Sequence, residues 1–338
     1  MKELYIVTGA SGHLGNVLVR RLVEQNHLVW VFLLDGEKNV VEGVERVYHG
    51  DVRNKESMKP VFEDAKEHEV NFIHCAGIVS IKSEYSKLLH DVNVGGTKNV
   101  ADLCLEYKIH KLVYISSVHA IPDNTHGEVI REIRTFDPQA VTGHYGKTKA
   151  EATQYVLDAG ERGLSVNVIH PSGIIGPYDF GRGHTTTLIT DYCRGKLVAA
   201  MAGGFDFVDV RDVAEGIISC AQKGEPGACY LLSNRYYTVK ELLDMLSEIT
   251  GRKKITSYLP LWFVRLTAPL AELYYRILKQ PPLYTRFSIF TLSTNNLYSS
   301  EKAMNELGYK TREMNETLKD TYDWLVQGGR IKCGEEGG

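Results

Sequence analysis

A glycine-rich turn behind the first apolar run constrains the fold of this chain more than any other feature. Residues Leu4–Thr8 have the pattern of a buried strand, and Leu14–Gln25 have that of an amphipathic helix. Between them stands Thr8-Gly9-Ala10-Ser11-Gly12-His13-Leu14-Gly15, with a glycine at every third position. Glycines here allow a tight turn and the close approach of a pyrophosphate to the helix N-terminus. The expected dinucleotide contacts are Gly9, Ser11, Gly12, His13, Leu14 and Gly15.

Strands and helices then alternate strictly, which predicts an α/β fold with a doubly wound parallel sheet and right-handed crossovers. The expected strands are Leu4–Thr8, Leu28–Leu34, Val47–His49, Asn71–Cys75, Lys111–Ser117 and Ser165–His170. The expected helices between them are Leu14–Gln25, Glu56–His68, Tyr85–Tyr107 and His144–Arg162. This part of the chain, residues 1–171, is interpreted as a nucleotide-binding domain.

The pattern changes after Pro171, where glycines mark a long loop and mainly helical segments follow. We expect a smaller, mainly helical C-terminal cap over residues 172–330, which binds the substrate, and a flexible tail over 331–338. Two strands within 205–233 are expected to return to the main sheet: Phe205–Val210 and Cys229–Leu232. The expected helices are Asp212–Gln222, Val239–Thr250, Leu261–Leu278 and Asn315–Val326.

Charge and cysteine content exclude several classes of protein. The 338 residues include 39 Lys and Arg against 42 Asp and Glu, so no basic excess indicates a nucleic-acid partner. The six cysteines form no C-x-x-C pair, which disfavours a metal site and indicates reduced thiols in a cytoplasmic protein. The first residues lead straight into a strand, and no long uncharged apolar run follows, so neither a signal peptide nor a membrane span is predicted.

The end of the second strand bears on the choice between NAD and NADP. Asp35 stands about 20 residues after the last glycine of the turn, where an acid binds the ribose 2′-OH. No Arg follows to hold a 2′-phosphate, so NAD is favoured over NADP. Alternatively, Asp35 is a solvated turn residue before Gly36.

Two further strand ends are candidates for cofactor contacts. Asp51-Val52 closes the third strand and either reaches an adenine edge or forms a plain turn. Cys75-Ala76-Gly77 closes the fourth strand with small residues, where a backbone must approach the cofactor. Asn93 lies inside the next expected helix, and Gly95 and Gly96 after it indicate close packing, because a glycine costs about 1 kcal/mol mid-helix.

The catalytic candidates are Ser116, Ser117, Tyr145 and Lys149. A Tyr-x-x-x-Lys pair lies on one helix face, but six of the 19 tyrosines have a Lys four residues on. Only Tyr145 begins the helix that follows the strand ending in Ser116-Ser117. These elements meet at the carboxyl edge of the sheet, where the nicotinamide belongs.

The residue types match hydride transfer at a carbonyl carbon, which needs a proton donor or acceptor at the oxygen. A tyrosine pKa near 10 is too high at pH 7 by about 4 kcal/mol. An ammonium at about 4 Å supplies roughly 4 kcal/mol at an effective dielectric of 20, so Lys149 and a cationic nicotinamide together are expected to lower the pKa of Tyr145. Ser117 would hold the substrate oxygen.

At these residues the chain resembles the extended short-chain dehydrogenase/reductase family, and most closely its dihydroflavonol-4-reductase and 3β-hydroxysteroid-dehydrogenase branch. The resemblance covers nearly the whole chain. It includes Thr8-Gly9-x-x-Gly12-x-x-Gly15, Asp51-Val52, Asn93, Ser116-Ser117, Tyr145-x-x-x-Lys149, His170-Pro171-Ser172-Gly173 and Phe207-Val208-Asp209-Val210-Arg211-Asp212. It implies a Rossmann fold and a catalytic Ser117, Tyr145 and Lys149 set supported by Asn93. Leu33 and Leu34 depart from the acid or Arg that members usually carry there.

The resemblance also implies contacts that the motifs alone do not give. The nicotinamide would touch Pro171, Ser172, Gly173 and Ile174, with Ser116 nearby. Apart from the resemblance, His119 is a substrate candidate because it follows the serines in a loop at a strand end. Tyr178 and Phe205 are expected either to line the substrate pocket or to belong to the core, and Ile78 is a further substrate candidate. A homodimer through Tyr85–Tyr107 and His144–Arg162 is expected.

Three functions compete. The first is an NAD(P)-dependent dehydrogenase or reductase that interconverts a secondary alcohol and a ketone on an apolar, ring-bearing substrate, such as a steroid or flavonoid. The second is a nucleotide-sugar epimerase with tightly bound NAD; Arg182, Arg265, Arg276 and Arg286 would grip its diphosphate, or are solvated rim cations. The third, a dinucleotide sensor, needs no catalytic set. A dehydratase is disfavoured, because Val118 and His119 stand where its Asp-Glu pair would.

The segment from Leu259 to Phe290 is apolar on more than one helical face. It is interpreted as core of the cap, as a mobile lid over an apolar substrate, or as a shallow membrane contact, which is possible but not favoured.

Overall fold

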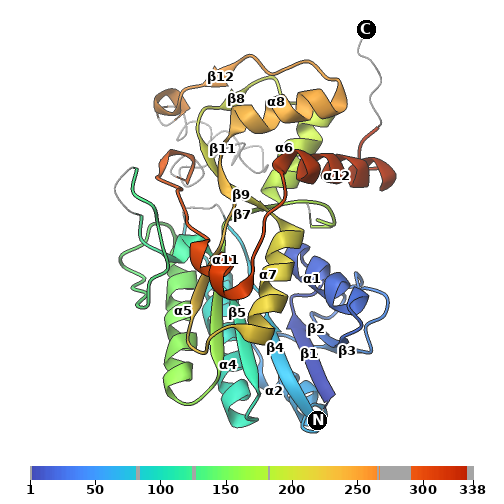
Figure 1. Cartoon of the computed structure of the whole chain (residues 1–338), viewed down its shortest axis with the longest axis vertical. Helices are drawn as coiled ribbons and strands as arrows, with labels where there is room; N and C mark the ends of the chain where they lie inside the picture. Colours follow the sequence, from blue (N-terminus) through green and yellow to red (C-terminus); the bar gives the residue numbers. More distant parts are fainter. Residues whose placement is uncertain are drawn as a thin grey trace.

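Seven parallel strands form the central sheet of the chain, for which a computed structural model describes residues 2–80, 84–123, 127–181, 183–264, 266 and 291–332 (Figure 1). Their order across the sheet is β10-β6-β5-β4-β1-β2-β3. Their bounds are β1 Lys2–Thr8, β2 Leu28–Leu33, β3 Arg46–His49, β4 His68–His74, β5 Lys111–Ile115, β6 Val166–Pro171 and β10 Cys229–Leu232. The order reverses beside β1, so the carboxyl ends of β1 and β4 form the crevice of a doubly wound sheet.

Helices cover both faces of this sheet, because the strands bury alternate residues on opposite sides. Leu4 and Ile6 face one apolar core, shared with helices α2 (Lys55–Asp64), α4 (Thr97–Glu106) and α5 (His144–Glu161). Tyr5 and Val7 face a second core, shared with α1 (His13–Glu24), α7 (Val210–Lys223) and α11 (Glu301–Leu307). The predicted α/β fold is therefore confirmed.

One predicted helix differs in kind. The expected continuous helix Tyr85–Tyr107 begins at Lys87 and consists of α3 (Lys87–His90), a π-helical segment η1 (Asp91–Gly96) and α4. Gly96 has no room for a side chain, since a Cβ would lie 2.7 Å from the Val52 side chain, whereas Gly95 meets nothing within 4 Å. Close packing thus accounts for Gly96 alone. The wide turn carries Asn93, and such π-turns often stand at functional sites.

The elements after Pro171 include a second, smaller sheet, and one strand prediction is wrong. Strand β9 (Gly204–Asp209), expected over Phe205–Val210 to return to the main sheet, instead pairs with β7 (Gly173–Ile175) and β11 (Arg235–Thr238). The position beside β6 is taken by β10, as predicted for Cys229–Leu232. An apolar run predicts a buried strand but does not say which sheet buries it.

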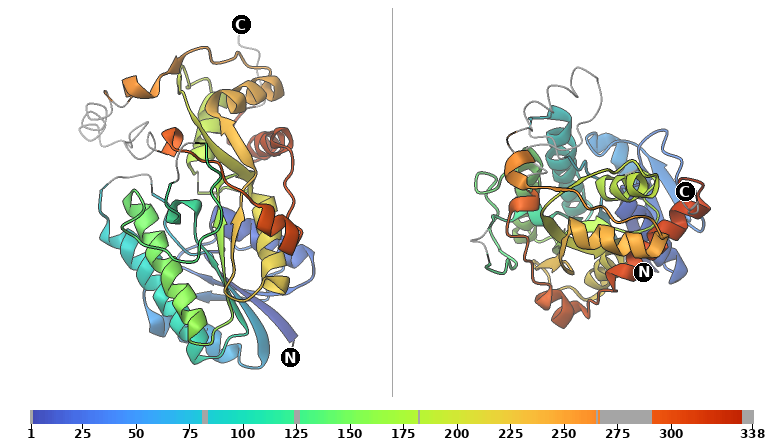
Figure 2. Two further views of the ribbon diagram at one scale, coloured as in Figure 1. Left: turned by 60° about the vertical axis from the view of Figure 1, so that its left-hand side comes forward. Right: turned by 90° about the horizontal axis from the view of Figure 1, so that it is seen from above.

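Short strands and helices complete the cap, which lies over the carboxyl ends of the main strands (Figures 1 and 2). These elements are α6 (His184–Cys193), β8 (Ala200–Met201), α8 (Val239–Thr250), β12 (Tyr258–Leu259) and α12 (Met314–Gln327). The predicted helix Leu261–Leu278 is helical at 261–264 and at 266, and its other residues lie outside the described ranges, as do 333–338 of the predicted tail. Within the described ranges, no helix is long and apolar enough to cross a bilayer.

Candidate active site

The glycine turn leaves the N-terminus of α1 open for an anion. Gly9 has φ +70°, and a Cβ there would lie 2.7 Å from the Ala76 backbone nitrogen, while a Cβ on Gly15 would overlap the carbonyl of Gly9. Gly12 caps the helix without a side-chain hydrogen bond, and the first turn holds no acid. The first N–H groups of α1 therefore suit the pyrophosphate of a dinucleotide, flanked by half-buried Ser11 and Leu14.

His13 fastens this turn to the segment behind β6. Its Nε2 lies 2.9 Å from the carbonyl oxygen of Pro177, and burial lowers the pKa of the imidazole. A neutral His13 donates this hydrogen bond, because a carbonyl only accepts. The loop after Pro171 is thereby held beside the expected phosphate site.

The end of β2 presents an apolar and an acidic side chain to solvent. Leu34, directly after the strand, is 49% exposed, and Asp35 is exposed in the following turn. Glu37, which the sequence analysis did not single out, accepts a 3.0 Å hydrogen bond from the Leu34 backbone N–H. Two carboxylates therefore stand at this strand end, and no cation is bonded to either in the described hydrogen bonds.

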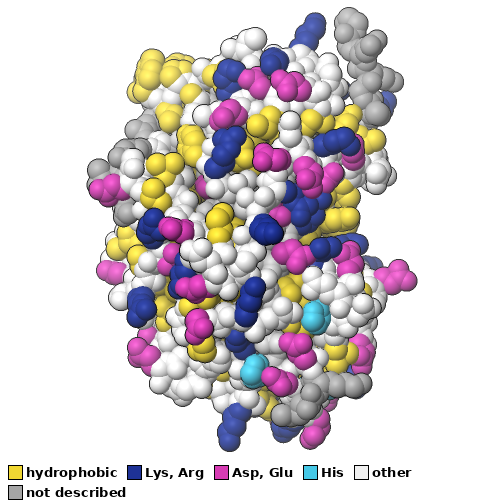
Figure 3. Space-filling model, viewed as in Figure 1, with side chains coloured by type: hydrophobic (Ala, Val, Ile, Leu, Met, Phe, Trp, Pro, Cys, Tyr) yellow, Lys and Arg dark blue, Asp and Glu magenta, His cyan; other side chains and the backbone are white. Residues whose placement is uncertain are grey.

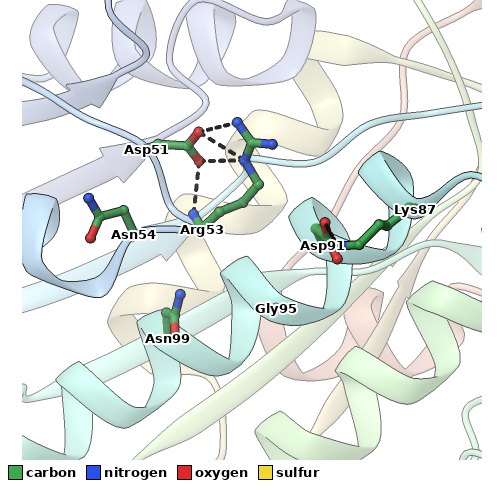
Figure 4. A pocket seen from close by; sticks show the side chains of 7 residues that line it. All are labelled: Asp51, Arg53, Asn54, Lys87, Asp91, Gly95 and Asn99. Atoms are coloured by element: carbon green, nitrogen blue, oxygen red, sulfur yellow. Dashed lines mark hydrogen bonds and ion pairs between the residues drawn. The ribbon is translucent and has the colours of Figure 1, made fainter.

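Asp51 holds an ion pair at the rim of an open hollow of about 580 Å³ (Figure 4). Arg53 Nε donates to both carboxylate oxygens of Asp51, at 3.1 Å to Oδ1 and 2.9 Å to Oδ2, and Nη2 donates to Oδ2 at 2.5 Å. These bonds lower the pKa of Asp51. Val52 is buried behind this pair, and its carbonyl accepts a 2.9 Å hydrogen bond from Asn99. Asp51, which is expected either to reach an adenine edge or to form a plain turn, thus has an ionised carboxylate that Arg53 holds in place.

Tyr145, Lys149 and the two serines converge where β5 ends. Tyr145 and Lys149 lie on successive turns of α5 and are 6% and 5% exposed. Ser117 Oγ accepts a 3.2 Å hydrogen bond from the His119 N–H and lies near enough to the Tyr145 hydroxyl to lower its pKa, whereas Ser116 lies 2.7 Å from the Thr153 hydroxyl on the same helix. Ser117, and not Ser116, therefore faces the Tyr145 hydroxyl.

The pKa values in this cluster reflect its burial. Burial raises the pKa of Tyr145 to about 12, against the lowering effect of the Ser117 hydrogen bond. Burial also lowers the pKa of Lys149 to about 8. Lys149 donates to the Ile115 carbonyl at 2.7 Å and to the Tyr114 hydroxyl at 3.4 Å. In the chain by itself the pKa of Tyr145 thus lies above its ordinary value, opposite to the lowering predicted for the complete site with its cationic nicotinamide.

The Asn93 side chain holds the loop that follows β4 by two hydrogen bonds. Its Oδ1 accepts a 2.8 Å hydrogen bond from the Ile78 N–H, and its Nδ2 donates to the Ile78 carbonyl at 3.0 Å. A Cβ on Gly77 would lie 3.3 Å from Asn93 Oδ1 and 3.4 Å from Lys149 Nζ. The segment Cys75-Ala76-Gly77 therefore runs between the glycine turn and the lysine, and a side chain on Gly77 would press tightly against Asn93.

An aromatic wall stands beside Tyr145. The His119 ring meets the Tyr145 ring edge-on at 6.0 Å and stacks on Phe205 at 5.5 Å. Burial lowers the pKa of His119 to about 4, so the imidazole is neutral at pH 7. Phe205 also packs against Tyr298, at 6.3 Å, which sequence reasoning missed.

Tyr178 is not brought to this wall. Its ring lies over the Arg20 guanidinium at 4.7 Å and against Trp324 at 6.1 Å, beside α1 and α12.

The expected nicotinamide contacts after β6 lie in one short segment. Pro171 ends β6, and Ser172 donates a 2.5 Å hydrogen bond to buried Asp206 before Gly173 and Ile174 begin β7. The four arginines that were expected to bind a diphosphate or to be rim cations all lie outside the described residues: Arg182, Arg265, Arg276 and Arg286.

Other groups in the site were missed because single histidines or threonines carry no signal in a sequence. His170 donates from Nδ1 to the Ser117 carbonyl at 3.0 Å and stacks on Phe136 at 5.1 Å. His74 and Thr97 lie buried behind Asn93. The sequence offers two cues: their positions at strand ends and helix starts and, for His170, its place in the motif His170-Pro171-Ser172-Gly173.

Comparison with known proteins places this geometry in a family. The pattern of the NAD-dependent epimerase/dehydratase family matches residues 5–232. The chain is 30% identical to sterol demethylase protein B of Methylococcus capsulatus, over 96% of this chain and 99% of that protein. It is 31% identical to 3beta-hydroxysteroid-dehydrogenase/decarboxylase isoform 1 of Arabidopsis thaliana, over 81% of this chain and 65% of that protein. The crystal structure of gox2253 superposes with a TM-score of 0.84 at 28% identity, covering 97% and 99% of the two chains.

Proposed function

The chain belongs to the NAD-dependent epimerase/dehydratase family, and from this premise we propose that it interconverts a secondary alcohol and a ketone on an apolar, ring-bearing substrate of the sterol type. The observation that carries the proposal is the contact of the Tyr145 ring with the wall of His119 and Phe205. A flat apolar ring system suits stacked rings better than a sugar diphosphate does. The names of the sterol demethylase and 3beta-hydroxysteroid-dehydrogenase relatives point to the same substrate class.

In this mechanism each residue of the cluster has one task. The glycine turn and the N-terminus of α1 would hold a nicotinamide dinucleotide, which would supply or accept the hydride at the reacting carbon. Ser117 and the Tyr145 hydroxyl hold the carbonyl oxygen, and Tyr145 gives up or takes the proton there. Lys149, with a pKa of about 8, is mostly protonated at pH 7 and supplies the positive charge that lowers the energy of a tyrosinate.

Asn93 and His170 act as positioning residues in this proposal. Asn93 fixes the Ile78 backbone next to the Lys149 ammonium, and His170 fixes the Ser117 carbonyl from behind. Asn93, His170 and Ser117 are buried and Ile78 is half-buried, so these bonds are already formed without a ligand and the cluster is pre-organised. We propose NAD as the preferred cofactor, because Asp35 and Glu37 at the end of β2 disfavour a 2′-phosphate.

A substrate panel tests the function. Purified protein is assayed with steroid, flavonoid and small aliphatic alcohols and ketones, each with NAD(H) and NADP(H). We expect turnover of ring-bearing substrates with an exchangeable cofactor. Tightly retained NAD together with interconversion of nucleotide sugars would favour the epimerase alternative, and turnover of aliphatic ketones alone would remove the ring-bearing substrate from the proposal.

A further inference from the structure

A buried chain of hydrogen bonds runs behind the site, from the glycine turn to the π-helical segment. The Thr8 hydroxyl lies 2.7 Å from His74 Nδ1, and His74 Nε2 lies 3.1 Å from the Thr97 hydroxyl. The Thr97 hydroxyl donates to the Asn93 carbonyl at 2.7 Å. His74, Thr8 and Thr97 are at most 1% exposed, so each polar atom here must find its partner inside the protein.

The direction of every bond in this chain follows from the number of protons. Thr97 has one hydroxyl proton and gives it to the Asn93 carbonyl, which only accepts, so Thr97 must accept from His74. His74 therefore carries its proton on Nε2. Nδ1 of the neutral ring then accepts from the Thr8 hydroxyl, whose oxygen in turn accepts the Ala76 N–H at 3.2 Å.

Nothing in this arrangement favours a charged imidazole. Burial, and then the nearby Lys149 ammonium, lower the pKa of His74 to about 3. A protonated ring would also donate from Nδ1 and displace the Thr8 hydroxyl proton from its only acceptor in the chain of bonds. The network is thus complete with one tautomer of one neutral histidine.

We propose that His74 is a positioning residue that couples the dinucleotide loop to the catalytic cluster through its two ring nitrogens. Nδ1 fixes Thr8 and, through it, the Ala76 backbone, against which Gly9 lies too close for a Cβ. Nε2 fixes Thr97 and the carbonyl of Asn93, whose side chain clamps Ile78 beside Lys149. This inference rests on the proposed function only where it is tested by kcat and KM, because those measurements need the proposed reaction.

The two sides of the imidazole can be removed one at a time. An Asn amide reaches about as far as Nδ1, and a Gln amide about as far as Nε2, so His74→Asn keeps the Thr8 side and His74→Gln keeps the Thr97 side. We expect His74→Asn to lower kcat about tenfold with nearly unchanged KM for NAD. We expect His74→Gln to raise KM for NAD about tenfold and to lower kcat less than twofold. A residue with a merely structural role would change both constants together.

Two readouts decide the proposal even if the reaction is a different one. Nitrogen-15 NMR of histidine-labelled wild-type protein should show His74 as the neutral Nε2–H tautomer at pH 7. Amide exchange at Ile78, whose N–H bonds Asn93, should be faster in His74→Asn and in Thr97→Val than in His74→Gln and Thr97→Ser, which keep the donor and the hydroxyl. An Nδ1–H or doubly protonated ring, or equal exchange in all four variants, would overturn the proposal. Failure of the substrate panel with these two results intact would reject the proposed function alone.

Discussion

The Lys149 ammonium donates a 2.7 Å hydrogen bond to the carbonyl of Ile115, the last residue of β5. Lys149 also donates to the Tyr114 hydroxyl, so the hydrogen bonds seen among the described residues use two of its three ammonium protons. Lys149 is therefore anchored to the sheet edge by backbone, while its remaining proton is available near Gly77. Burying a charge among neutral partners lowers the free energy of unfolding, and this loss can be measured.

That cost makes stability depend on pH. Burial lowers the pKa of Lys149 from 10.5 to about 8. Below about pH 8 the lysine is protonated in both folded and unfolded chains, and between about 8 and 10.5 the unfolded chain binds more protons. Stability therefore rises with pH across this window, by about 3 kcal/mol from this group.

The variant Lys149→Met isolates this contribution. Urea unfolding of both proteins from pH 7 to pH 10.5 should show the free-energy difference between variant and wild type shifting in favour of the wild type as pH rises. Titrating cysteines and tyrosines are common to both proteins and cancel in the difference. Parallel curves would mean that Lys149 keeps an ordinary pKa.

Removing the Tyr145 hydroxyl should abolish turnover and leave the fold intact. Tyr145→Phe keeps the buried ring against His119 and loses only the group that exchanges the proton, so activity should fall about 10²-fold or more. Melting and NAD affinity should stay near wild type. Lys149→Ala should lose activity and NAD affinity together. A Tyr145→Phe protein that keeps a tenth of the wild-type turnover would show that another group moves the proton.

The aromatic wall should set the preference for large substrates. Phe205→Leu removes the ring on which His119 stacks, so KM should rise several-fold for ring-bearing ketones and stay unchanged for small ones. Phe62→Leu is the matched control, because Phe62 on α2 stacks on Phe72 of β4 in the core at 5.1 Å. An equal effect of both variants on KM would indicate a general loss of packing.

Sequence patterns located the strands because buried parallel strands leave continuous apolar runs. β2 is such a run, whereas β6 is buried along its whole length although it contains Asn167 and His170. Both strands end at the edge of the sheet that carries the cofactor and catalytic candidates. The Tyr145 choice among six similar pairs depended on this placement, because spacing alone did not distinguish them.

What the patterns missed depends on contacts between distant residues. β9 is as fully buried as a strand of the main sheet, and only its pairing with β7 and β11 shows where it lies. Gly95 and Gly96 indicate close packing, which the structure shows only for Gly96 against Val52, and neither glycine predicts the π-helical turn that contains them. His74 and His170 become interpretable only with their partners, Thr97 and Ser117, in place.

The choice of cofactor can be tested at the two carboxylates behind β2. If Asp35 disfavours a 2′-phosphate, Asp35→Asn should improve kcat/KM for NADP relative to NAD several-fold. Glu37→Gln is the comparison, since Glu37 already accepts the Leu34 N–H and a neutral amide oxygen keeps that bond. A shift in Glu37→Gln alone would assign the discrimination to Glu37, and no shift in either would place it elsewhere.

The described start of the apolar segment 259–290 does not behave as one buried core. Val264 is fully buried, whereas Trp262 and Leu266 are 67% and 71% exposed. Hydrophobic side chains gather on the surface near β12 (Figure 3). The interpretation of Trp262 as core is therefore wrong, while the rest of the segment, with Tyr274, lies outside the described residues.

Trp262→Ala should then cost about 1 kcal/mol or less, because an exposed ring loses little on truncation. Trp30→Ala, at 1% exposure, is the matched control and should cost about 3–5 kcal/mol. A lid predicts that Trp262→Ala raises KM for bulky ketones only. A membrane contact predicts that wild-type protein, and not Trp262→Ala, co-sediments with anionic vesicles. A Trp262→Ala protein with normal KM for every substrate, together with wild-type protein that stays in the supernatant, would reject both readings of this surface.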